Sequence, residues 1–186
     1  MDKKFTWTVD CEFDFGGRTN GDIGIRYGLP LILQEFKRYN IKGLFFISTE
    51  LFRDYKNDIK KIKEDGHTLG SHGHFHIIYK DKYRWLQDKE ISESLLSVIT
   101  GQSYHQYRAP KFNKILSNHI YSNPINHVGL LKKLWFKTSI PSNPIFYLHP
   151  FDLVSSANSP NLFCRIWYSR HKEASKLFKM LLEKYK

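Results

Sequence analysis

The alternation of short apolar runs with amphipathic helical segments restricts this chain to few architectures. Apolar, β-branched and aromatic residues predict strands at 5–9, 42–49, 67–73 and 103–110. Helical spacing of apolar residues predicts helices at 28–40, 50–66 and 91–101, the second with Thr49 as N-cap and Gly66 as its stop. Beyond Phe112 the alternation weakens, although 143–150 predicts a late strand and 170–186 a terminal helix. Strands and helices in this order predict an α/β fold, with a parallel sheet covered by helices.

The size of the chain fits one folding unit. Its 186 residues, 41% of them hydrophobic, are enough for one sizeable core and too few for two. The longest apolar runs, "LPLIL" and "GLFFI", are far shorter than a membrane span, and residues 1–9 lack the apolar run of a secretory signal. We therefore expect one soluble, cytoplasmic domain.

The charge of the chain favours anionic partners. Twenty-nine Lys and Arg against eighteen Asp and Glu give a net charge of +11, which suits nucleic acid, acidic glycan or a lipid surface. However, the sequence contains no zinc-finger cysteine pair, no aromatic RNA-recognition motif and no defensible helix-turn-helix signal. We therefore do not expect nucleic acid to be the partner.

Chemically useful side chains follow the C-terminal ends of the predicted strands. The carboxyl ends of parallel strands share one edge of the sheet, and active sites of α/β proteins lie there. We therefore expect these distant segments to converge on one site, and the residues concerned are Asp10, Glu12, His72, His76, Arg108 and His149.

The first of these segments, "TVDCEFD", is rich in carboxylates. In an extended segment Asp10, Glu12 and Asp14 project to the same side. Paired carboxylates can divide the roles of metal ligand and general base. The alternative is a solvated acidic loop.

The second segment, "GHTLGSHGHFH", concentrates histidines. His72 and His76 have the i, i+4 spacing with which two imidazoles can bind one divalent ion from a turn, and Gly73 relaxes the backbone between them. His74 shares their face only if the segment is extended, and His67 reads as a surface residue. One carboxylate with two histidines leaves coordination positions open, as in a catalytic metal site. The alternative is a histidine-rich loop without metal.

Four motifs, in order, resemble the polysaccharide deacetylase family, also called the NodB-homology or carbohydrate esterase family 4 group. "TVDCE" resembles its first motif, "EDGHTLGSHGHFH" its second, "YRAPKF" its third and "FYLHPFD" its last. The resemblance covers the chain from Thr8 to about Asp152, and the second motif with its lead-in is the most specific.

The resemblance implies a distorted, incomplete (β/α) barrel that removes acetyl groups from N-acetylated sugars by metal-assisted hydrolysis. Carried over by position, Asp10 is the catalytic base, Arg108 its orienting partner and His149 the acid. The implied metal ligands are Glu12, His72 and His76, and the implied cofactor is a divalent ion, with zinc as the first expectation. The chemistry is consistent with this, because amide hydrolysis requires a polarised carbonyl, a nucleophile at neutral pH and protonation of the leaving amine.

The chain also departs from the family pattern. The common first motif has adjacent aspartates, whereas here Cys11 separates Asp10 from Glu12, so that Asp14 is an alternative ligand. The family's tryptophan and aspartate motif has no clear counterpart. The short interval before His149 implies that the single domain, residues 1–186, is shortened between about 113 and 145.

Three functions compete on these grounds. The first is an active N-deacetylase on an N-acetylated sugar, glycan or glycolipid. The second is hydrolysis of another non-peptide carbon–nitrogen bond in a small molecule, and the third is an inactive, shortened relative that binds carbohydrate or a protein partner.

The terminal helix has two interpretations. Its apolar residues form lines that either pack on the core or, with the surrounding lysines, contact an anionic membrane surface peripherally. The apolar residues are Leu177, Phe178, Leu181, Leu182 and Tyr185, and the lysines are Lys172, Lys176, Lys179 and Lys184.

Overall fold

The structure is a computed structural model of the chain, and it describes residues 6–17, 21–103, 106–110, 126–127, 145–154 and 174–185. In these ranges no helix combines the length and the apolar character that crossing a bilayer requires. The predicted shortening between about 113 and 145 falls almost wholly outside them, as do Lys172 and the end of the third motif. The single-domain organisation therefore stays a prediction.

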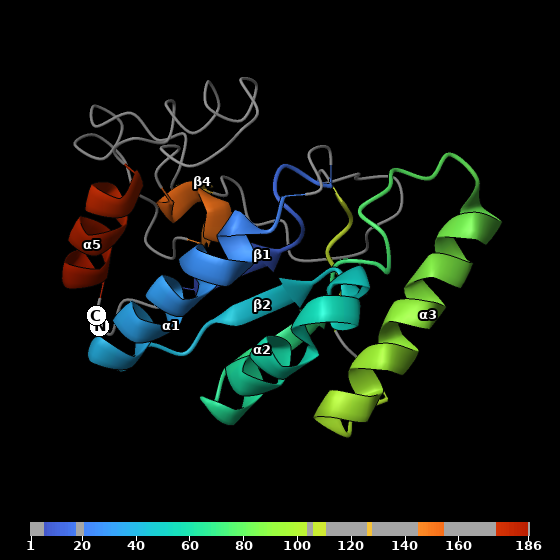
Figure 1. Ribbon diagram of the computed structural model, residues 1–186, viewed down its shortest axis with the longest axis horizontal. Helices are drawn as coiled ribbons and strands as arrows, with labels where there is room; N and C mark the ends of the chain where they lie inside the picture. The colour runs from blue at the N-terminus through green and yellow to red at the C-terminus, as the bar shows by residue number, and fades with distance from the viewer. Residues whose placement is uncertain are drawn as a thin grey trace.

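Within the described residues, five strands form a fully parallel sheet at the centre of the fold (Figure 1). The strand order is β3-β2-β1-β5-β4, so that the N-terminal strand lies in the middle of the sheet. The predicted α/β class with a parallel sheet is confirmed. The strands are β1 (Thr6–Cys11), β2 (Leu44–Ile47), β3 (Thr68–Ser71), β4 (Asn126–His127) and β5 (Ile145–Leu148).

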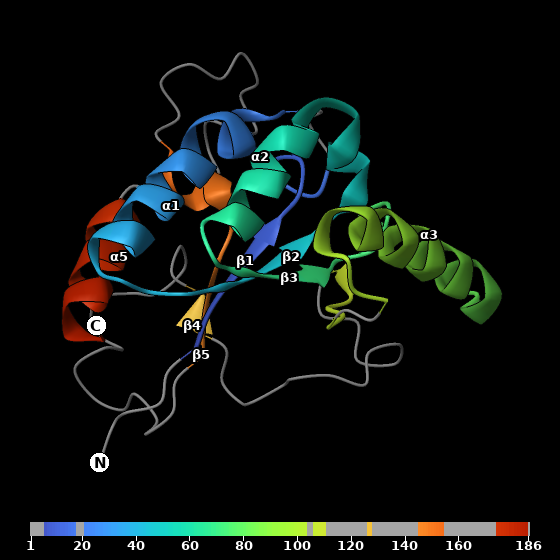
Figure 2. The same ribbon diagram turned by 90° about the horizontal axis from the view of Figure 1, so that it is seen from below.

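Helices cover one face of this sheet, and Figure 2 shows α1, α2 and α5 on the same side of the strands, with α3 beyond β3. Short π-helical or 3-10 turns precede α1 and α2, and another follows β5. The helices are α1 (Leu29–Arg38), α2 (Phe52–Glu64), α3 (Lys82–Thr100) and α5 (Ala174–Lys184); the turns are η1 (Gly24–Gly28), η2 (Thr49–Leu51) and η5 (Pro150–Leu153).

Strand β1 separates the apolar core from the polar face because successive side chains point to opposite sides of a strand. Trp7, Val9 and Cys11 lie in the core beneath the helices. The Trp7 ring centroid is 5.8 Å from that of Phe36 in α1 and 5.4 Å from that of Phe178 in α5. The alternate residues of β1 therefore face the other side of the sheet, where the polar groups gather.

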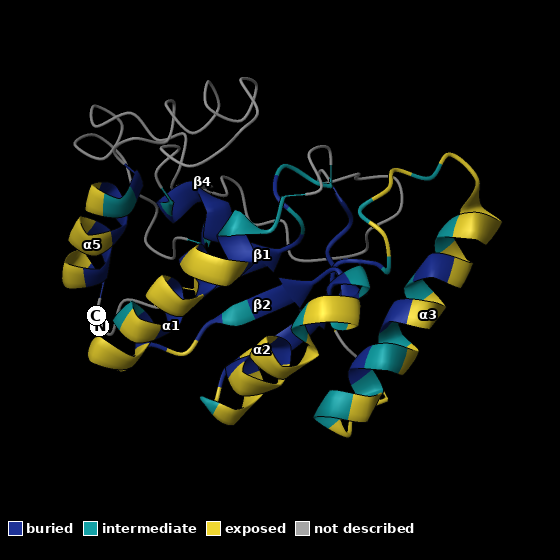
Figure 3. Cartoon of the chain, viewed as in Figure 1, coloured by how far each residue is buried: buried dark blue, intermediate teal, exposed yellow. Residues whose placement is uncertain are grey.

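The apolar face of α5 is buried in this core, as the first of its two interpretations expected. Leu181 and Leu182 are fully buried, while Lys176 and Lys179 are exposed. Figure 3 shows the division between the inner and outer faces of the helix. Insertion into a lipid surface would need the apolar residues that the core already holds, so any membrane contact would depend on the lysines.

Several predicted boundaries are wrong. The 3-10 turn η2 begins at Thr49, and α2 has no side-chain N-cap, so Thr49 does not cap that helix; Gly66, by contrast, takes the left-handed conformation (φ 82°) after α2 ends. Helix α3 begins well before residue 91, because the Asp81 side chain accepts a hydrogen bond from the Arg84 amide and caps it. The predicted strand at 103–110 is, among its described residues, a single bridge between Ser71 and Tyr107.

Candidate active site

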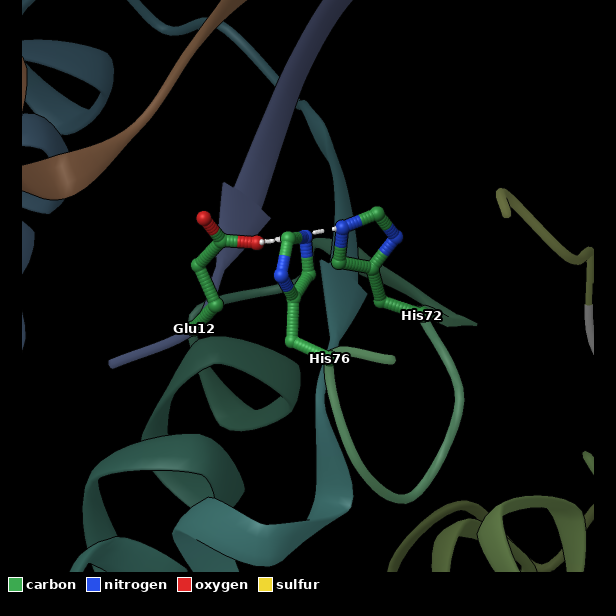
Figure 4. Close-up of side chains that lie close together, drawn as sticks. All are labelled: Glu12, His72 and His76. Carbon is green, nitrogen blue, oxygen red and sulfur yellow. Dashed lines mark ion pairs between the residues drawn. The ribbon is translucent and has the colours of Figure 1, made fainter. Parts of the chain in front are cut away.

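Three side chains from two segments of the chain meet at the carboxyl edge of the sheet (Figure 4). Glu12 follows β1, and His72 and His76 lie on the loop after β3. Glu12 Oε2 is 3.2 Å from His72 Nε2 and 2.7 Å from His76 Nε2. One ligand atom from each residue lies within 4.8 Å of the other two, so a single ion could contact all three.

The donor set of this cluster fits a divalent metal ion. Glu12 Oε2 is buried, and within the described part of the chain no hydrogen bond of acceptable geometry reaches it, although both imidazoles face it. Burial acts to raise the pKa of Glu12, but the close imidazoles of His72 and His76 hold it well below its usual range. An ionised carboxylate with two Nε2 atoms suits zinc or a similar ion and leaves coordination positions open.

His72 is oriented by a backbone carbonyl. Its Nδ1 donates to the Arg108 carbonyl oxygen at 2.7 Å, and this bond is buried. A donor at Nδ1 leaves the Nε2 lone pair directed at Glu12 in the neutral imidazole, which is the tautomer that binds metal. The short segment after Tyr107 therefore helps to arrange the cluster.

A second acidic residue lies beside the cluster in a buried ion pair. Arg108 Nη1 donates to Asp10 Oδ1 at 2.5 Å, and its Nη2 donates to the Thr8 hydroxyl at 3.0 Å. The guanidinium lies over the Phe46 ring, 4.1 Å from its centroid. Asp10 Oδ2 is 3.9 Å from His72 Nε2, so this carboxylate borders the cluster while Arg108 orients it.

His149, after β5, also borders the cluster. Its Nε2 is 3.7 Å from Glu12 Oε1, and its Nδ1 is 3.4 Å from Asp152 Oδ2. Burial acts to lower the pKa of His149, but Asp152, with Glu12 and Asp10, raises it to about 9. The imidazole is therefore protonated at neutral pH in this arrangement and can give a proton.

Asp152 was not singled out in the sequence, although its spacing from His149 is readable. Its carboxylate accepts a hydrogen bond from the His149 backbone N–H at 2.7 Å, as the third residue of a capping box. The pattern "HPFD", with an acidic residue three positions after the histidine, is the available signal.

Asp14, the alternative ligand, is occupied elsewhere. Its two carboxylate oxygens accept hydrogen bonds from the backbone N–H groups of Ile23 and Gly24, at 2.9 and 2.8 Å. These bonds hold the start of η1, and the carboxylate that lies with the histidines is Glu12.

The two remaining histidines of the motif are not in the cluster. The side chain of His74 pairs with the Thr49 hydroxyl at 3.0 Å, outside the group formed by Glu12, His72 and His76. The expectation that His67 lies at the surface is wrong. It is buried against Phe36 and Phe45, and its Nδ1 accepts a hydrogen bond from the Gly43 amide at 3.1 Å.

Comparisons with known proteins identify the family of the chain. A family model described as polysaccharide deacetylase matches residues 18–119. A peptidoglycan-N-acetylglucosamine deacetylase of Bacillus cereus is 26% identical over 128 residues, which is 62% of this chain and 46% of the relative. The chain therefore matches less than half of the length of that relative.

Two solved structures have the same fold. Peptidoglycan deacetylase PdaC from Bacillus subtilis superposes with a TM-score of 0.62 at 13% identity, covering 98% of this chain and 85% of that one. A carbohydrate esterase family 4 pseudoenzyme from Bacillus anthracis superposes with a TM-score of 0.60 at 14% identity, covering 98% and 62%. The predicted distorted, incomplete (β/α) barrel is confirmed, and identities this low establish the fold alone.

Proposed function

Because the chain belongs to the polysaccharide deacetylase family, we propose that it is a metal-dependent hydrolase that removes N-acetyl groups from a glycan or glycoconjugate. The observation that carries the proposal is the meeting of Glu12, His72 and His76 in one cluster, bordered by a separate acidic group and a separate imidazole. This is the set of groups that hydrolysis of an unreactive amide requires.

Glu12, His72 and His76 would hold the ion, and zinc is the metal that their nitrogen and oxygen atoms suit best. A divalent ion bound there supplies Lewis acidity, which polarises an amide carbonyl and acidifies water. Glu12 brings the negative charge to the ligand set. The Arg108 carbonyl keeps His72 in the tautomer that it needs.

Asp10 and His149 would carry the proton transfers. Asp10, held by Arg108, accepts the proton that the attacking water loses. His149, kept protonated by Asp152, donates a proton to the amine as it leaves. Asp10 lies beside His72 and His149 lies beside Glu12, so both groups border the proposed metal site.

An N-acetylated sugar is the substrate class that the relatives support. The Bacillus cereus relative is named for N-acetylglucosamine in peptidoglycan. The net charge of +11 would attract an acidic glycan or the anionic head group of a glycolipid.

Metal analysis combined with acetate release tests the proposal. The protein is loaded with zinc, its metal content is measured, and acetate is assayed with a panel of N-acetylated oligosaccharides. His72→Ala and His76→Ala should lose both metal and activity, whereas His74→Ala, in the same loop but outside the cluster, should keep both. Stoichiometric zinc in both His72→Ala and His76→Ala would refute the ligand assignment.

An inactive, carbohydrate-binding relative is the second candidate. It is supported by the lack of a clear counterpart to the family's tryptophan and aspartate motif in the sequence. Zinc-loaded protein that binds N-acetylated oligosaccharides without releasing acetate would favour this candidate. Release of acetate or ammonia only from small amides would instead favour hydrolysis of another carbon–nitrogen bond.

A further inference from the structure

The loop that joins His72 to His76 is held by a carboxylate from another element, Asp88 of α3. Asp88 Oδ2 accepts a hydrogen bond from the His74 backbone N–H at 2.8 Å, and Oδ1 accepts one from the Phe75 backbone N–H at 3.0 Å. The Tyr79 hydroxyl donates to Oδ1 at 3.0 Å. One buried side chain therefore binds two consecutive backbone amides between the two histidines.

The loop and Asp88 fit each other too closely for a side chain at Gly73. Asp88 is only 5% exposed. Gly73 has φ of 86°, and a Cβ atom added there would lie 2.7 Å from Asp88 Oδ2. A glycine at this position allows both the left-handed backbone and the approach of the carboxylate.

The carbonyl groups of the same loop are bound by a different element, η2. The Thr49 N–H donates to the Gly73 carbonyl at 3.0 Å, and the Glu50 N–H donates to the His74 carbonyl at 2.9 Å. Segment η2 therefore binds the acceptors of the loop while α3 binds its donors. The backbone between the two imidazoles is therefore hydrogen-bonded to two other elements, η2 and α3.

We propose that Asp88 is a positioning residue that sets the relative placement of His72 and His76, and thereby the affinity of the site for metal. The inference rests on the proposed function, because it assumes that both imidazoles bind one ion. If the loop were not held, the two rings, whose centroids are now 5.1 Å apart, would have to be ordered when the ion binds. Outer groups that orient metal ligands typically change affinity by about 10- to 100-fold.

Asp88→Asn is the informative substitution because it keeps the size of the side chain. An amide has one acceptor oxygen and one donor nitrogen, so one of the two loop N–H groups would face a donor. Glu90→Gln is the matched control, since it removes the same charge from an exposed position of the same helix. Tyr79→Phe removes the third hydrogen bond of Asp88 and leaves its bonds to the loop amides.

Two measurements on folded protein decide the matter. Zinc affinity is measured by calorimetry, and amide hydrogen exchange of a peptide covering 72–79 is measured by mass spectrometry on the metal-free protein. Asp88→Asn should weaken zinc binding about 10- to 100-fold and speed exchange in this peptide. Glu90→Gln should match the unmodified protein in both, and Tyr79→Phe should lose less affinity than Asp88→Asn.

The outcomes separate this inference from the proposed function. If the unmodified protein binds zinc and Asp88→Asn binds it equally well, the positioning role is refuted and the proposed function stands. If the unmodified protein binds no zinc, the proposed function and the affinity claim fail together, and the exchange data alone decide whether Asp88 holds the loop. An equal loss in Glu90→Gln would attribute the effect to charge and would also refute positioning.

Discussion

Removing one partner of the buried Asp10–Arg108 pair should destabilise the metal-free protein strongly. Arg108→Met leaves the carboxylate of Asp10, now 2% exposed, without its guanidinium. Breaking a buried ion pair from one side costs about 3–5 kcal/mol, because a charge stays buried without compensation.

In Arg108→Met, protonation of the Asp10 carboxyl sets an upper limit on the cost of the buried charge and makes this cost depend on pH. An aspartic acid with an ordinary pKa of about 3.9 needs about 4 kcal/mol to be protonated at pH 7, and about 1.5 kcal/mol at pH 5. The loss from Arg108→Met should therefore be about 4 kcal/mol at pH 7 and markedly smaller at pH 5. Asp10→Asn in the Arg108→Met background removes the unpaired charge and should restore most of the loss.

Urea unfolding followed by circular dichroism, with chelator present, measures these differences. Arg108→Lys serves as a control that keeps the charge and gives up the two-pronged donation to Asp10 and Thr8. A loss below about 1 kcal/mol at both pH values, as for a solvent-exposed pair, would refute the reasoning. Additive effects of Asp10→Asn and Arg108→Met would refute it as well.

Three further predictions concern the proton donor, a buried histidine and the metal. His149→Ala should keep metal but slow deacetylation by a factor of about 10² to 10⁴, with a smaller loss on an activated ester whose leaving group needs no proton. The unmodified enzyme should lose activity as pH rises through the pKa of His149, which is about 9 without metal. The pH–activity profile of the variant should not show this loss at alkaline pH. Burial, with Lys42 nearby, lowers the pKa of His67 from 6.5 to about 4, so the folded protein keeps this imidazole neutral in a pH range where the unfolded chain binds a proton. The free energy of unfolding should therefore fall as pH drops from about 6.5 to about 4. Denaturant titration should show a smaller fall in His67→Gln. Zinc at about 100 times its dissociation constant should stabilise the protein by about 2.7 kcal/mol, and a thermal shift in His74→Ala but not in His76→Ala would agree with the ligand assignment.

The sequence was most informative where the geometry of a single strand decides which way its side chains point. Alternation in β1 separates Trp7, Val9 and Cys11 from Thr8, Asp10 and Glu12, and this separation is a local property of an extended chain. The same reasoning led to the other strand ends and to the convergence of their polar groups. Whether these residues act as ligands, base and acid stays a prediction for experiment.

Features that depend on partners distant in the sequence could not be read in the same way. Asp88 looks like an ordinary helix residue until α3 is placed against the histidine loop. Asp14 is in alternation with Asp10 and Glu12 and so was an alternative metal ligand. However, its carboxylate accepts a hydrogen bond from the backbone N–H of Ile23, just before η1. The described residues of strand β4 are recognised as a strand through their pairing with β5. His67 has a polar side chain that is buried because the rings of Phe36 and Phe45 pack against it.

The central position of β1 also sets the order in which the site can be completed during synthesis. Val9 pairs with Phe45 on one side and with Leu148 on the other, so the second partner leaves the ribosome long after the first. Glu12, His72 and His76 are all present once the first half of the chain has emerged, whereas His149 arrives only with β5. Contacts this distant in sequence slow folding, and one edge of the central strand stays unpaired in the meantime. A nascent chain therefore contains the three proposed ligands before β5, and the proposed proton donor that follows it, have been synthesised.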